Sequence, residues 1–265
     1  MLIARGLNKY YSANIQNIIY ICNTHETKTI MRINIVSDHF SFPRISRYLT
    51  ATSNNNQRAI KLYKHNLKVS QSFYTILSVL EVVLRNKLSE KLSSHFSDTN
   101  WIINQKSGFM IHPTLTHVHP ISGRRIHNHF LKKSVEKTEN KLTQNGIAVT
   151  PGKIIADQSF SFWTELFELT FFRILRGRPI QIFNYLPAGT SRVDILTRLT
   201  KVRKFRNRIS HHEPICFNGT AIDFTDALDV YNTIIELLNW IDPNLSGFIA
   251  DLDQVTKKIN SAQRV

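Results

Sequence analysis

The chain has 265 residues, of which 34 are Lys or Arg and 19 are Asp or Glu, so its formal net charge is +15. Hydrophobic residues make up 42% of it, which is enough apolar material for a folded core and excludes a disordered polycation. Two cysteines, Cys22 and Cys216, do not support a disulfide-stapled secreted fold, so we expect a cytoplasmic protein. No run of eighteen apolar residues occurs, so we expect no membrane span, and the excess positive charge predicts a polyanionic partner.

The first 30 residues are polar and show no periodic apolar pattern. They also lack the apolar region and the small-residue cleavage site of a signal peptide. Met31 opens a more regular stretch, and we interpret residues 1–36 as an N-terminal extension that is disordered or not native. Residues 37–265 are then expected to form a single domain with a basic insertion around residues 101–150.

The clearest helical signal lies in residues 59–96. Leucines recur there at spacings of three and four, as in the buried stripe of an amphipathic helix: Leu77, Leu80, Leu84, Leu88 and Leu92. Ser70 or Ser72 is the expected N-cap. Glu81 and Arg85 fall within the apolar sector, where a charge needs a partner. They are four residues apart, so they either pair with each other or reach a polar group on another helix.

Residues 101–150 contain several Pro and Gly residues, which predict loops, and then a basic stretch. Two His-x-His pairs, His117/His119 and His127/His129, raise the question of a metal site. Neither a Cys nor an acidic residue accompanies them, whereas zinc sites recruit such ligands at tight spacings. We therefore expect no metal and interpret this region as a loop and a basic helix that contact phosphate groups.

Two further helices are predicted downstream. One begins near Asp157 or Ser159 and carries an aromatic face that is typical of a core. The next begins at Ser191, where Asp194 nearly completes a capping box, and ends around residues 210–212 ahead of Pro214. Its expected apolar stripe is Val193, Leu196, Leu199, Val202, Phe205 and Ile209.

A turn at Asn218-Gly219 precedes another helix, which ends before Pro243, and a short terminal helix is expected at residues 245–259. No alternating β-branched run of useful length appears outside the opening segment. The sequence therefore predicts an all-α fold.

The helix that begins at Ser191 concentrates positive charge, with no acidic residue between Asp194 and Glu213. Its cations are Arg198, Lys201, Arg203, Lys204, Arg206 and Arg208. Like charges four residues apart destabilise a helix, and a bound phosphate backbone would relieve their repulsion.

His211 and His212 follow at the exit of that helix. Histidine can move the proton of a ribose 2′-hydroxyl or of a leaving group, and arginine offers a fixed donor fork to a phosphorane. The residues alone leave two interpretations open. Arg206 and His211 form an RNA-cleaving pair, or cationic side chains merely stabilise a helix C-terminus.

The string Arg206-Asn-Arg-Ile-Ser-His211-His-Glu-Pro214 resembles the signature of the HEPN superfamily, in which Arg and a polar residue are followed by His at four to six intervening positions. More narrowly, the chain resembles the Abi-like family of abortive-infection proteins. Residues 42–49, residues 62–66 with 80–86, and residues 160–166 resemble the N-terminal segment, the paired polar helix motif and the aromatic helix of that family. The similarity covers about residues 38–242, with the motifs in the family's order.

The resemblance implies an all-α, HEPN-type helical bundle with additional flanking helices. It also implies a metal-independent endoribonuclease without cofactors that acts in phage defence. The catalytic residues would be Arg206, His211 and Asn207, although His212 also satisfies the motif spacing. The supporting residues would be Glu81, Arg85, Asn86, His212 and Glu213. The RNA-binding residues would be Arg124, Arg125, Lys132, Lys133, Arg198, Lys201, Arg203, Lys204 and Arg208.

The implied reaction is attack of the ribose 2′-oxygen on the adjacent phosphate, which leaves a 2′,3′-cyclic phosphate and a 5′-hydroxyl. HEPN nucleases commonly pair two copies of the motif, and one copy is visible here, so a homodimer with a composite site is expected. RNA is the expected substrate, and a structured noncoding RNA is a further expected partner. Three alternatives stay open: a non-catalytic RNA-binding HEPN module, a helix-turn-helix DNA-binding regulator, and a structural subunit whose function a partner protein carries.

Overall fold

The structure, a computed structural model, describes residues 33–265. Of these residues 69% are helical and 4% lie in strands, which confirms the all-α prediction. The chain divides into two compact units, the first ending at Ile60 and the second comprising Lys61–Val265. Most of the predicted N-terminal extension lies outside the described residues, and positions 33–36 belong to helix α2 (Ile33–Phe40).

In the first unit, α2 is followed by α3 (Phe42–Ala51) and by the beginning of α4 (Asn56–Phe96). Asn55 caps α4, because its side-chain oxygen accepts a hydrogen bond from the Arg58 backbone N–H at 3.0 Å. The prediction that Ser70 or Ser72 caps this helix is wrong. Both serines lie inside α4, and the Ser72 hydroxyl donates to the Val69 carbonyl at 2.7 Å.

Helix α4 is the longest helix among the described residues and continues into the second unit. Its predicted leucine stripe is confirmed, since all five side chains of the stripe are buried. An 18-residue window of α4 has a mean hydropathy of 1.3, which by length and composition alone would suffice to cross a membrane, and 39% of that window is buried inside the protein. The core helix of a water-soluble protein meets the same criterion, so this property is weak evidence for a membrane span.

The predicted basic insertion is folded. It contains α5 (Trp101–Asn104), the short 3₁₀ helices η1 (Gln105–Ser107), η2 (Phe109–Ile111) and η3 (Pro113–Leu115), the strands β1 (Thr116–Val118) and β2 (Arg125–His127), then α6 (Phe130–Gln144) and α7 (Pro151–Asp157). The strands form an antiparallel hairpin in which Val118 is opposite Arg125. Phe109 anchors this region, stacking on Phe96 of α4 at 5.6 Å between ring centroids and meeting Phe171 edge-on at 6.4 Å.

The remaining elements of the second unit follow in chain order. They are α8 (Phe160–Glu165), α9 (Leu169–Ile174), η4 (Arg178–Ile182), α10 (Arg192–Ser210), β3 (Phe217–Asn218), β4 (Ala221–Ile222), α11 (Thr225–Ile241), α12 (Asn244–Ile249) and α13 (Val255–Ala262). The predicted aromatic face is core, since Phe160, Trp163, Phe167 and Phe171 are buried. Of the two expected N-caps, Ser159 occupies the cap position of α8, and Asp157 is instead the last residue of α7.

Helix α10 begins and ends where the sequence predicts. Ser191 and Asp194 form a complete capping box, and the helix ends at Ser210. One assignment to its apolar stripe is wrong, because Val193 is 54% exposed. Val193 lies nine residues before the buried Val202, which places it about half a turn away on the opposite face.

The predicted terminal helix at residues 245–259 is two helices, α12 and α13. Asp253 separates them, since one carboxylate oxygen accepts the Tyr231 hydroxyl of α11 at 2.6 Å and the other accepts the Val255 backbone N–H at 2.9 Å. A carboxylate held in this way starts a new helix instead of continuing the old one.

Candidate active site

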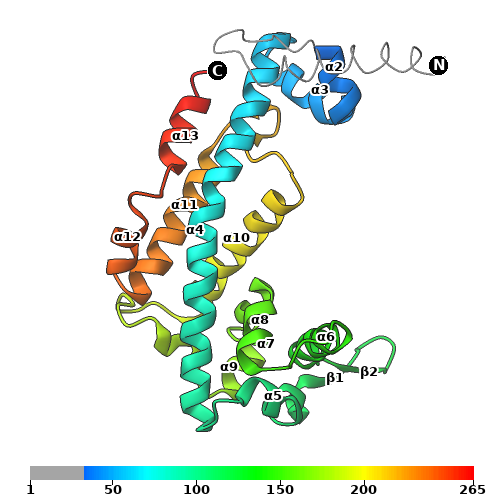
Figure 1. Cartoon of the computed structure of the whole chain (residues 1–265), viewed down its shortest axis with the longest axis vertical. Helices are drawn as coiled ribbons and strands as arrows, with labels where there is room; N and C mark the ends of the chain where they lie inside the picture. Colours follow the sequence, from blue (N-terminus) through cyan, green and yellow to red (C-terminus); the bar gives the residue numbers. More distant parts are fainter. Residues whose placement is uncertain (1–32) are drawn as a thin grey trace, which may run out of the picture. The chain divides into compact units, whose positions relative to one another are not determined.

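Helices α4 and α10 contact each other within the second unit. The rings of Phe73 on α4 and Phe205 on α10 are 4.7 Å apart, and both are buried. Beyond the end of α10, the buried side chain of Asn66 accepts the Ile215 backbone N–H at 2.9 Å. These two contacts hold the C-terminal half of α10 and its exit to α4. Figure 1 shows α10 running obliquely beside the long helix α4. Arg206 follows Phe205 directly and is thereby held beside α4.

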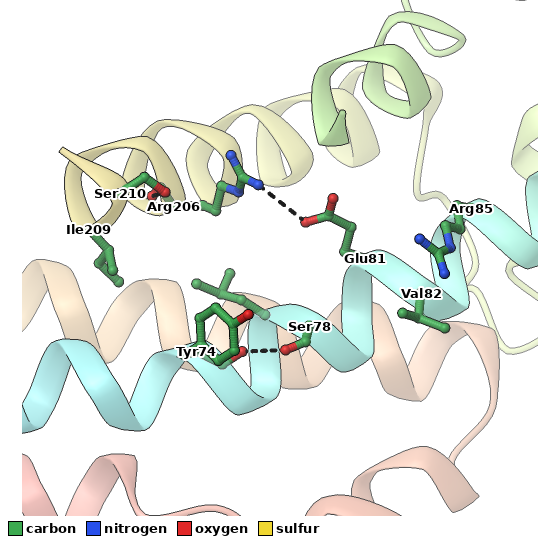
Figure 2. A pocket seen from close by; sticks show the side chains of 9 residues that line it. Tyr74, Ser78, Glu81, Val82, Arg85, Arg206, Ile209 and Ser210 are labelled. Carbon is green, nitrogen blue, oxygen red and sulfur yellow. Dashed lines mark hydrogen bonds and ion pairs between the residues drawn. The ribbon is translucent and has the colours of Figure 1, made fainter. Parts of the chain in front are cut away.

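A pocket of about 280 Å³ lies between the two helices (Figure 2). Helix α4 contributes Tyr74, Leu77, Ser78, Glu81, Val82 and Arg85, and helix α10 contributes Arg206, Ile209 and Ser210. Three residues singled out in the sequence, Glu81, Arg85 and Arg206, therefore line one pocket although 125 positions separate Glu81 from Arg206.

The Arg206 guanidinium is only loosely held in this pocket. Its Nη2 is 3.8 Å from the Glu81 carboxylate, which is longer than the 2.7–2.9 Å typical of a charge-assisted hydrogen bond. The Arg206 side chain is 38% exposed, that of Glu81 is 23% exposed, and Arg206 donates no side-chain hydrogen bond to any residue of the described chain. Its donors are therefore available to an anionic ligand.

Arg85 contributes a second guanidinium to the pocket. Its Nη1 donates to the Ala156 carbonyl of α7 at 3.2 Å, and its Nε is buried without an acceptor among residues 33–265. Glu81 and Arg85 do not pair with each other within 4 Å. The sequence left two alternatives open, and the structure shows the second, in which each residue reaches a group on another helix. Glu81 approaches Arg206 of α10, and Arg85 donates to the Ala156 carbonyl of α7.

The other residues of the predicted site do not line the pocket. His211 is the C-cap of α10, directly after the pocket-lining Ser210; its backbone N–H donates to the Asn207 carbonyl at 2.9 Å. The His211 side chain is exposed and makes no hydrogen bond within the described chain. Asn86 and Asn207 are also exposed. The structure thus brings Arg206 together with Glu81 and Arg85, and it places the His211 side chain beyond the lining of their pocket.

His212 and Glu213 form the terminal turn of α10. The His212 N–H donates to the Ile209 carbonyl at 3.0 Å and the Glu213 N–H donates to the Arg208 carbonyl at 2.9 Å, which is the pattern of a Schellman motif. His212 has φ 56°, the left-handed conformation that usually belongs to glycine at this position. The turn holds a histidine in a conformation that its side chain disfavours.

The opposite face of α10 is closed by acidic residues of α11. Arg198 pairs with Glu236 at 3.0 Å, Lys201 pairs with Asp229 at 2.7 Å, and Arg208 pairs with Asp226 at 2.6 Å. Helix α11 thus supplies counter-charges for three of the six cations of α10, and these three pairs relieve part of the repulsion along the helix. RNA contact by these three side chains stays a prediction.

Two predicted RNA-binding cations on α10, Arg203 and Lys204, make no ion pair within 4 Å to the part of the chain that is described. Arg203 lies near Glu165 of α8, and the pKa of that carboxyl is raised mainly by burial. The four predicted RNA-binding cations of the insertion lie on or beside the β1–β2 hairpin and α6: Arg124, Arg125, Lys132 and Lys133. Lys132 approaches Glu136 at 3.7 Å, and the other three are exposed.

His127, the last residue of β2, and His129, the N-cap residue of α6, make local contacts. The rings of His127 and His129 are 5.3 Å apart, and His127 Nδ1 lies 2.8 Å from the Thr116 hydroxyl. Within residues 33–265, no group of three or more His, Cys, Asp or Glu side chains is arranged to hold a metal ion.

Sequence reasoning missed Tyr74, Ser78, Val82 and Ser210 as pocket residues. Tyr74 precedes Glu81 by seven residues, which is two helical turns and nearly the same face of α4. That spacing is the one signal in the sequence that could have associated this tyrosine with the polar motif.

No family model matches the chain, and neither the curated proteins nor the solved structures contain a significant match to it. Membership of the Abi-like family stays a prediction from the sequence motifs.

Proposed function

We propose that the chain is a metal-independent endoribonuclease of the Abi-like HEPN type. The observation that carries the proposal is the state of Arg206, a partly exposed guanidinium in a pocket, whose one ion pair within the described chain is a 3.8 Å contact to Glu81. A positioned arginine with unused donors suits a phosphate that gains charge in a transition state, because its planar fork can bind two oxygens at once.

In the proposed reaction, Arg206 binds the scissile phosphate and stabilises the phosphorane. His211 accepts the proton of the ribose 2′-hydroxyl, or donates a proton to the leaving 5′-oxygen, because an imidazole can act as a general base or a general acid. The 2′-oxygen forms a bond to phosphorus and the bond to the 5′-oxygen breaks, which leaves a 2′,3′-cyclic phosphate and a 5′-hydroxyl. Asn207 orders the helix end, and Glu81 restrains the Arg206 side chain.

The assembly is part of the proposal. His211 lies at an exposed helix end, so a second copy of the chain that covers this surface would complete the site. RNA as substrate, a structured noncoding RNA as partner, a cytoplasmic location and a role in phage defence follow from the family resemblance.

Cleavage assays on the purified chain test the activity. Single-stranded and structured RNAs, labelled at the 5′ end, are incubated with EDTA present, and the product ends are identified by mass spectrometry. We expect 2′,3′-cyclic phosphate products, a loss of about 10²–10³-fold for Arg206→Ala, and a loss of about 10²–10⁴-fold for His211→Ala. Lys68→Ala is the matched control, because it removes an exposed cation of α4 that does not line the pocket. A requirement for Mg²⁺, or full activity in both variants, contradicts the proposal.

One observation favours a second candidate, a non-catalytic RNA-binding module. Arg206 lines the pocket and His211 does not, so the chain by itself can grip a phosphate without a base beside it. Under this alternative RNA binds, Arg206→Ala weakens the binding, and none of the RNAs is cleaved.

A further inference from the structure

Tyr74 is an unusually exposed aromatic residue on a helix whose neighbouring positions form the core. Its side chain is 74% exposed, whereas the adjacent Phe73 is fully buried and Leu77 is 8% exposed. Tyr74 makes no side-chain hydrogen bond within the described chain, and its backbone carbonyl accepts the Ser78 hydroxyl at 2.6 Å (Figure 2). Neither packing nor hydrogen bonding accounts for a tyrosine at this position.

The pocket that Tyr74 lines changes character along its length. Tyr74 of α4 and Ile209 of α10 both line the pocket, and further along α4 the charged side chains of Glu81 and Arg206 face each other (Figure 2). Seven residues of helix separate Tyr74 from Glu81, a rise of about 10 Å. That is roughly the span of one nucleotide from its phosphate to the far edge of its base.

We propose that Tyr74 is the stacking platform for one unpaired base of a nucleic acid strand whose phosphate lies at Arg206. That the strand is RNA rests on the proposed function. Bases stack on exposed tyrosines because each base has a π-face, and guanidinium groups bind the backbone oxygens beside them. A base within a duplex has its faces covered by its neighbours, so the site selects single-stranded segments, loops or bulges.

The electrostatics of the pocket favour a nucleotide over an apolar protein surface. Covering the pocket with apolar side chains would take the donors of Arg206 out of water without supplying acceptors, which is costly. Arg85 already has a buried Nε without an acceptor among residues 33–265. A nucleotide provides both an apolar face for Tyr74 and anionic oxygens for Arg206.

Binding of an uncleavable strand tests the proposal. A single-stranded 2′-O-methyl oligonucleotide, which lacks the nucleophilic 2′-hydroxyl, carries 2-aminopurine and is titrated with the full chain at one fixed salt concentration. We expect Tyr74→Ala to weaken binding by about 5- to 150-fold and to abolish the quenching of 2-aminopurine fluorescence that stacking causes. Tyr74→Phe keeps both within about twofold, because the ring is retained. Tyr185→Ala is the matched control, since this tyrosine is 58% exposed and lies outside the pocket.

Each other outcome has a definite meaning. Unchanged affinity and quenching in Tyr74→Ala overturns the proposal, and so does a change in oligomeric mass by light scattering, which would make Tyr74 a subunit contact. The test does not depend on catalysis. If binding depends on Tyr74 but the chain cleaves no RNA, the proposed nuclease activity is overturned and the base-stacking role of Tyr74 is retained. If the chain cleaves RNA but binding does not depend on Tyr74, the base-stacking role is overturned and the nuclease activity is retained.

Discussion

The two faces of helix α10 hold the same kind of residue in opposite states. On the face toward α11, Arg198, Lys201 and Arg208 each meet a carboxylate at 2.6–3.0 Å. On the face toward α4, Arg206 has a single ion pair within the described chain, at 3.8 Å to Glu81. The cations of the first face hold α10 to α11 through ion pairs, and the cation of the second face is open to a ligand. A high density of positive charge in a sequence therefore does not indicate by itself where a polyanion binds.

Arg206 and Arg208 show this contrast within two positions of the chain, because side chains two residues apart on a helix point to nearly opposite sides. Arg208 donates from Nη1 to Asp226 at 2.6 Å and from Nη2 to the Pro214 carbonyl at 2.8 Å. It holds the segment after α10 in place, and that segment includes His211. Arg208 is thus a structural arginine that positions the helix exit, whereas Arg206 keeps its donors for another molecule.

The largest expected difference between the two arginines is in stability. We expect Arg208→Ala to lower the free energy of unfolding by about 1–3 kcal/mol, because the carbonyl of Pro214 loses its donor and Asp226 loses its counter-charge. Arg206→Ala should change it by less than about 0.5 kcal/mol, since a long, partly exposed ion pair contributes little. Equilibrium unfolding in urea measures both, and Asp226→Asn completes a double-mutant cycle with Arg208→Ala. Equal losses for the two arginine variants would remove the distinction between the faces.

A smaller effect is expected at the end of the same helix. His212→Gly should raise the free energy of unfolding by about 0.5–1 kcal/mol, net of the contact that the imidazole makes, because glycine adopts φ 56° without the penalty of a Cβ. His211→Gly is the matched control. His211 has φ −90°, so glycine there should bring no gain. A gain at position 211, or a loss at position 212, would show that the left-handed turn is not a source of strain.

The ends of α10 could be predicted from the sequence because local signals set them. The residues that pair with its side chains could not be predicted, because those contacts are long-range. The cap at Ser191 and Asp194 depends on residues three apart, so the sequence alone locates it. The carboxylates that neutralise Arg198 and Arg208 stand on another helix, 38 and 18 positions away. No spacing rule connects them. The site shows the same division: the Arg206 motif could be predicted from its local pattern, whereas its pocket needs two helices to meet.

The smallest expected effect concerns the start of α10 and depends on pH. Hydrogen bonds from the Ser191 hydroxyl and backbone N–H hold the pKa of Asp194 below its usual value of 3.8. A lowered pKa in the folded state means that this carboxylate contributes stability above its unfolded pKa and loses that contribution as pH falls through its folded pKa. We therefore expect Ser191→Ala to reduce stability at neutral pH and to flatten part of its decline below about pH 4. Unfolding in urea between about pH 2 and pH 6 measures this. Asp194 lies at the opposite end of α10 from Arg206, so the Ser191→Ala substitution should leave the pocket intact. If RNA binding depends on pH in the same way in the wild type and in Ser191→Ala, that dependence arises at the α4 face of the helix and not at its N-terminal cap.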